Sequence, residues 1–182
     1  MSHPIPQGEI LAEFFAPGTP CAQGSKSGFA YQKKETGKLG VALRECSTAA
    51  GAKRLKAWRK TCQTAAGVAF PGRLLDHAVH VDIVFLFPRP QSHYGTGRRA
   101  GQLKAWAAEE PMVTKPDREK LERAVFDALT GVVWVDDSRV VGGTPRKRYV
   151  MPGEVPGVHV RIRAACCCGL PKNLCPKHGL ES

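Results

Sequence analysis

In three stretches of the chain, hydrophobic residues alternate with polar ones or dominate, as in strands of a partly buried β-sheet. The strand at 78–87 is rich in β-branched and aromatic residues, and Pro88 and Pro90 end it. In the last stretch, Val158, Val160 and Ile162 share one face, which predicts a half-buried closing strand. The three predicted strands are residues 9–15 (EILAEFF), 78–87 (AVHVDIVFLF) and 157–164 (GVHVRIRA).

One predicted helix covers residues 50–66, where Leu55, Trp58, Cys62 and Ala65 recur at helical spacing. Basic side chains fill much of the remaining surface of this helix. A solvated face and a phosphate-facing surface both explain such a stripe. The basic residues are Lys53, Arg54, Lys56, Arg59 and Lys60.

A second helix begins after Pro116, with Asp117 suited to the N-cap position and Glu119 to the first turn. Gly131 stands where a helix-terminating residue is expected, and residues 132–135 (VVWV) then predict a short strand. Asp136 and Asp137 follow at its end. The apolar face of the helix consists of Leu121, Ala124, Val125, Ala128 and Leu129.

The carboxylates at the two ends of this helix–strand unit are expected to approach one another. A helix of a dozen residues spans about 18 Å, and a four-residue strand returns about 13 Å of that length. Asp117 and Glu119 would then come within reach of Asp136 and Asp137. Taken singly, each acid is also explained as a cap, a first-turn residue or part of a turn.

The charge composition of the chain indicates what chemistry these carboxylates serve. The 182 residues suit one domain, and 27 Lys and Arg against 16 Asp and Glu give a net charge of +11, which favours a polyanionic partner. Yet eight of the 16 acids fall between Glu109 and Asp137. Mg²⁺ prefers such carboxylate oxygens, bridges to phosphate, and can activate water for an in-line phosphodiester displacement. The pattern favours metal-assisted chemistry on nucleic acid.

The sequence also predicts two loops, the location of the protein and a separate C-terminal tail. Residues 16–28, rich in Gly, Pro and Ser, predict an exposed loop, and residues 92–114 form a long polar connection. No segment approaches the ~18 apolar residues of a membrane span, and the N-terminus lacks a signal-peptide core, so we expect a soluble cytoplasmic protein. Residues 166–182 look like an appendage to a domain of residues 1–165. Four residues of this tail could form a structural zinc site: Cys166, Cys168, Cys175 and His178.

Residues 114–148 resemble the RusA family of Holliday junction resolvases, particularly its phage-borne members. The family pattern is Asp-x-Asp at a helix start, a basic residue four positions after the second Asp, then D-A-L, a short strand and D-D-x-Q-V. Weaker similarity comes from SHYG at 92–95 and from the Gly/Pro loop after the first strand. The corresponding residues are Asp117-Arg118-Glu119, Arg123, Asp127-Ala128-Leu129 and Asp136-Asp137-Ser138-Arg139-Val140.

The resemblance implies an α+β fold with a mixed β-sheet packed by helices, and a homodimer that resolves four-way DNA junctions by paired phosphodiester hydrolysis in recombination and repair. It implies that Asp117, Glu119 and Asp137, with Asp136 adjacent, ligate Mg²⁺ or Mn²⁺. Arg123 and a later lysine, Lys147, would address the scissile phosphate or the leaving group. A bacterial or phage-infected host cell is the expected location. Candidates for the DNA-backbone surface are Arg98, Arg99, Lys104, Arg146 and Arg148.

Three positions depart from the family pattern: Glu119 replaces Asp, Arg123 replaces a lysine found in some members, and Arg139 replaces Gln. None removes a charge that the chemistry needs, so we expect activity. Two alternatives remain open. If Glu119 fails to complete the metal site, the chain would bind branched DNA without cutting it. If the Cys-rich tail is the functional part, the chain would be a zinc-dependent nucleic-acid adaptor.

Overall fold

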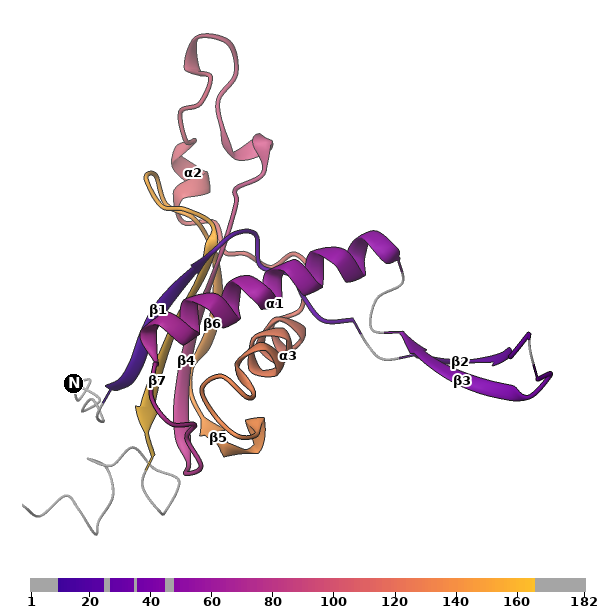
Figure 1. Ribbon diagram of the computed structural model, residues 1–182. Coiled ribbons are helices and arrows are strands. Elements are labelled where there is room, and N and C mark those ends of the chain that lie inside the picture. Colours follow the sequence, from indigo (N-terminus) through magenta and orange to yellow (C-terminus); the bar gives the residue numbers. More distant parts are fainter. Residues whose placement is uncertain (1–9, 25–26, 35, 45–47, 166–182) are drawn as a thin grey trace, which may run out of the picture.

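The computed structural model describes residues 10–24, 27–34, 36–44 and 48–165, and its centre is a mixed five-stranded sheet (Figure 1). Strand β7 lies between β1 and β4 and is antiparallel to both. Strands β5 and β6 pair in parallel with successive parts of β4. The strands are β1 (Ile10–Pro17), β4 (Val79–Phe87), β5 (Val140–Gly142), β6 (Pro145–Tyr149) and β7 (Gly157–Ala164). The α+β fold with a mixed sheet is therefore confirmed.

Two helices pack together in front of this sheet, α1 (Ala49–Ala69) and α3 (Arg118–Leu129) (Figure 1). All five residues of the apolar face predicted for α3 are fully buried. In α1, Leu55, Trp58 and Cys62 are buried as predicted, with Ala66 completing the face. The core forms where these two faces meet the inward side chains of β1, β4 and β7, including Val158, Val160 and Ile162.

The remaining elements lie outside this two-layer core. A separate hairpin, β2 (Ser27–Gln32) paired with β3 (Leu39–Arg44), stands apart from the main sheet (Figure 1). The short helix α2 (Ala105–Ala108) belongs to a projection between β4 and α3. Single 3-10 turns occur at η1 (Gln91–His93), η2 (Gly97–Arg99) and η3 (Asp137–Arg139). No helix in the described ranges is long and apolar enough to cross a membrane.

The strand expected over residues 132–135 is wrong. Residues 131–133 form a turn, and Trp134 makes only isolated bridges, to Leu75 and Thr130. Gly131, at φ +75°, reverses the chain, and its N–H donates to the carbonyl of Trp134. Val133 and Trp134 are consecutive and both fully buried. The apolar run therefore fills the core below the end of α3 and does not travel back along the helix.

The loop over residues 16–28 is less exposed than its composition predicts. Gln23 is buried, its backbone N–H donates to the carbonyl of Lys120, and Pro20 is buried as well. Gly18 donates to the carbonyl of Pro156. The described part of this segment is therefore held by backbone hydrogen bonds to α3 at Gln23 and to the loop before β7 at Gly18.

Candidate nuclease site

Asp117 and Glu119 lie at the start of α3 and are exposed. Asp117 holds the N-cap position but makes no side-chain capping hydrogen bond. Its Oδ2 instead lies 3.2 Å from the Nζ of Lys120. Arg123, one turn further along, is also exposed. The carboxylates at this end of the helix are thus directed to solvent, where an external cation or phosphate can reach them.

Lys147 comes from β6 but lies at this same end of α3. Its Nζ donates to the carbonyl of Thr114 at 2.7 Å and to that of Pro116 at 3.0 Å. Pro116 immediately precedes Asp117, so the structure brings Lys147 to the loop that leads into the first carboxylate. The ammonium group fixes this loop and adds positive charge beside it.

Asp136 and Asp137 lie at the 3-10 turn η3, directly before β5, and both are exposed. The Oδ1 of Asp136 accepts a hydrogen bond from the backbone N–H of Ser138 at 2.9 Å. Hydrogen bonds from the side chain and backbone of Ser138 lower the pKa of Asp136 below its ordinary value, because they stabilise the charged form. Asp136 is therefore ionised at neutral pH.

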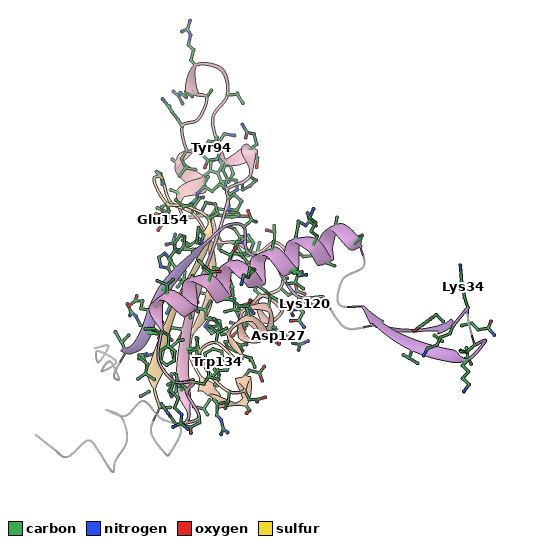
Figure 2. All side chains as sticks on the ribbon, in the orientation of Figure 1. Lys34, Tyr94, Lys120, Asp127, Trp134 and Glu154 are labelled. Carbon is green, nitrogen blue, oxygen red and sulfur yellow. The ribbon has the colours of Figure 1, made fainter. Side chains whose placement is uncertain are left out.

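The two acidic groups lie at opposite ends of α3 within one chain. Lys147 pairs with Phe85 of β4, whereas Val140, which follows η3, pairs with Val79. Six residues along a strand span about 20 Å. Trp134 stays hydrogen-bonded to Thr130 at the C-terminal end of the helix, and Figure 2 labels Lys120 and Trp134 at the two ends of α3.

Within the described residues of one chain, these carboxylates are not gathered into one metal site. The residues described here contain no group of three or more His, Cys, Asp or Glu side chains placed to hold a metal ion. The expected approach of Asp117 and Glu119 to Asp136 and Asp137 depended on a returning strand at 132–135, which the structure replaces with a turn.

Asp127 of the D-A-L motif has a structural role that the sequence pattern does not reveal. Its Oδ2 lies 2.7 Å from the Nη2 of Arg59, and that same nitrogen donates to the Oε1 of Gln23 at 2.8 Å. The contact joins α3 to α1 and to the buried Gln23 of the loop after β1. Arg59, counted in the basic stripe of α1, is thus partly used inside the protein.

The projection between β4 and α3 carries the basic residues Arg98, Arg99 and Lys104. Its base is held by Arg89, which is buried and donates to the carbonyls of Val150 (2.8 Å), Ala107 and Ala108 (3.2 Å). Arg98 and Arg99 lie in η2 and are exposed. The Nζ of Lys104 donates to the carbonyl of Ser92. The expected long polar connection is therefore an ordered projection that presents arginines to solvent.

The two arginines of β6 differ in availability. Arg146 is exposed. Arg148 forms a two-pronged ion pair with Glu154, with nitrogen–oxygen distances of 2.5 and 2.7 Å. This contact lowers the pKa of Glu154 to about 2. Arg148 is consequently committed to the turn between β6 and β7, which makes it a poorer candidate for a phosphate contact than Arg146.

The proposed zinc ligands of the tail lie outside the described residues, as does everything after Ala165. The closing strand predicted at residues 157–164 is β7.

One family model matches this chain: that of endodeoxyribonuclease RusA, over residues 32–163. The match includes both acidic groups, Arg123 and Lys147. Comparison with curated protein sequences gives no match, so the family model alone makes the assignment. Because it covers well over half of the chain, this protein belongs to the RusA family of endodeoxyribonucleases, metal-dependent phosphodiester hydrolases, and membership implies Holliday junction resolvase activity.

Proposed function

We propose that this protein resolves four-way DNA junctions by paired hydrolysis, with Asp117, Glu119 and Asp137 as the essential carboxylates and Asp136 beside them. The observation that supports this most directly is the family match over residues 32–163, which spans all four. These carboxylates would hold Mg²⁺ or Mn²⁺, the hard cations that prefer such oxygens. A phage or prophage source, expected from the sequence resemblance, belongs to the same proposal.

Arg123 and Lys147 would act on the phosphate at the Asp117 end of α3. Lys147 already lies beside Pro116, and Arg123 is exposed one turn beyond Glu119. Positive groups near a phosphodiester stabilise the charge that develops as the bond breaks. The guanidinium of Arg123 can also contact two phosphate oxygens at once.

A second copy of the chain would complete each site. In one copy, Lys147 beside the first group and Val140 beside the second pair with residues of β4 that are about 20 Å apart. A two-fold axis between the two acidic groups would place the Asp117 group of one copy against the Asp137 group of the other, twice per dimer. A standard interface, at about 800 Å² per partner, is wide enough to include both groups. The homodimer expected from the sequence would thus be needed to bring both acidic groups into each site.

Exposed apolar side chains next to both groups support such a contact. Val113 lies shortly before Asp117 and is 80% exposed. Val135 and Val141, on either side of the Asp136–Asp137 turn, are 43% and 48% exposed. In a two-fold dimer, the first patch of one copy would meet the second patch of its partner, which removes apolar area from water.

The dimer would offer two identical sites to a junction that itself has approximate two-fold symmetry, so opposed strands can be cut in pairs. Contacts to the DNA backbone would come from Arg98 and Arg99 on the projection, Lys104 at its base, and Arg146 on β6. Arg148 would serve these contacts only if its pair with Glu154 opens.

The first experiment is cleavage of a labelled synthetic four-way junction with Mg²⁺, beside a linear duplex of the same sequence. Paired symmetric nicks in the junction only, lost in Asp137→Asn, are the expected result. Junction binding without products at any Mg²⁺ or Mn²⁺ concentration would contradict the proposed cleavage. Unchanged cutting by Asp137→Asn would remove this residue from the site.

Mixing two inactive variants tests whether sites are shared. If sites are shared, a heterodimer of Asp117→Asn and Asp137→Asn has one site with both changes and one with neither. After random mixing, about a quarter of all sites should be intact, and their activity should appear as single nicks. Mn²⁺ binding followed by electron paramagnetic resonance should recover in parallel. Asp117→Asn mixed with Glu119→Gln is the matched control and should stay inactive, and a first mixture equally inactive would refute shared sites.

A further inference from the structure

The β2–β3 hairpin is a ribbon with little support from the rest of the protein. Its strands contact mainly each other, and Figure 1 shows it extending away from the main sheet beyond the N-terminal end of α1. A lone two-stranded hairpin is at best marginally stable in water. A ribbon that a protein nevertheless displays in this way is suited to a partner that covers it.

The tip of the ribbon concentrates positive charge. The N–H of Lys33 donates to the carbonyl of Lys38, and the N–H of Gly37 donates to the carbonyl of Lys33. Gln32 adds a side-chain hydrogen bond to the carbonyl of Gly37. Lys33, Lys34 and Lys38 are all exposed, and Lys34 is labelled at the far end of the ribbon in Figure 2.

These lysines have no ion pair with any carboxylate in the described ranges. The sequence KKETGK of the turn holds three lysines and one glutamate, so its formal charge is +2. Three ammonium groups so close together repel one another. A polyanion that binds them removes this repulsion and releases its own counterions.

We propose that the β2–β3 hairpin is a DNA-binding arm that lies along a duplex arm of the branched substrate, with Lys33, Lys34 and Lys38 on backbone phosphates. The proposal rests on the nuclease function proposed above. Six residues per strand give the ribbon a length of about 20 Å. The major groove of B-DNA, about 12 Å wide, admits a two-stranded ribbon.

Apolar side chains on the same ribbon fit this placement. Leu39 and Val41 lie on one face of β3 and are 80% and 74% exposed. Beside a groove, such side chains contact sugar carbons and thymine methyl groups, while the lysines reach the phosphates. Because the ribbon extends away from the sheet and α3, we assign it to a flanking duplex and not to the cleavage centre.

The test compares junction and linear-duplex binding by wild type and by the triple variant Lys33→Ala/Lys34→Ala/Lys38→Ala over a salt series. Three phosphate contacts contribute about 2.7 to the slope of log affinity against log salt, or about a 40-fold change between 50 and 200 mM salt. The variant should bind more weakly at low salt and show a slope lower by that amount. The matched variant Lys33→Arg/Lys34→Arg/Lys38→Arg should keep the slope of wild type.

Two other outcomes would overturn the proposed arm, and a third would refute only the resolvase function. An unchanged slope and affinity in the alanine variant would overturn the proposal. Loss of the dimer in light scattering, caused by the same change, would make the ribbon a subunit contact and would also overturn it. A wild type that binds duplex DNA but neither prefers nor cuts junctions would refute the resolvase function alone, since the salt slope on duplex DNA still tests the arm.

Discussion

Replacing Trp134 tests whether the turn after α3 is held as the structure shows. Trp134 is fully buried, its ring meets that of Phe126 edge-on at 5.9 Å, and its Nε1–H donates to the Oγ1 of Thr130 at 3.2 Å. Trp134→Ala removes this packing and should cost about 3–5 kcal/mol of unfolding free energy. Trp134→Phe keeps most of the ring volume and loses the hydrogen bond, at about 1–2 kcal/mol.

Urea unfolding at neutral pH measures both costs. For a domain of this size each kcal/mol lowers Tm by about 2–4 °C, so the alanine variant should melt about 6–20 °C below wild type. Because Asp136 follows two residues later, the alanine variant should also lose nuclease activity at temperatures where it is still folded. A cost below about 1 kcal/mol for Trp134→Ala would refute the buried turn, and equal costs for both variants would mean that the hydrogen bond, not packing, dominates.

Three further changes probe other parts of the fold. Gly143 has φ +148°, and a Cβ there would lie 1.9 Å from the carbonyl oxygen of Val81, so Gly143→Ala should lose about 3 kcal/mol or more in chemical unfolding. A neutral result would contradict the close approach of the β5–β6 connection to β4. Burial raises the pKa of Cys62 to about 12, so alkylation at pH 8, read by mass spectrometry, should modify Cys62 only on unfolding, whereas rapid labelling of the native protein would disprove its burial. The pKa of Glu154, about 2 when folded against 4.5 ordinarily, makes its pair with Arg148 stabilising above pH 4.5 and progressively lost as pH falls toward 2. Glu154→Gln should therefore reduce the loss of unfolding free energy between pH 4.5 and pH 2. An unchanged pH dependence of the unfolding free energy would argue against the pair.

The residues that form local structure could be identified from the sequence because their signals depend on near neighbours. The buried face of α3, its end at Gly131, and the strands at 78–87 and 157–164 all follow from periodicity and from residues within a few positions. The short strands β5 and β6 and the β2–β3 hairpin gave no such signal. Their pairing depends on partners elsewhere in the chain or on a turn whose lysines resemble an ordinary polar loop.

The sequence alone therefore indicated the candidate carboxylates, and it determined the helix that presents two of them and the positive charge suited to DNA. The tertiary structure alone decided where those carboxylates lie relative to one another. A run such as VVWV is apolar in either a strand or a buried turn, and only the pairing of Trp134 with Leu75 and Thr130 selects the turn. The turn keeps Asp137 at the end of α3 that lies far from Asp117, because β5 then begins beside the start of β4.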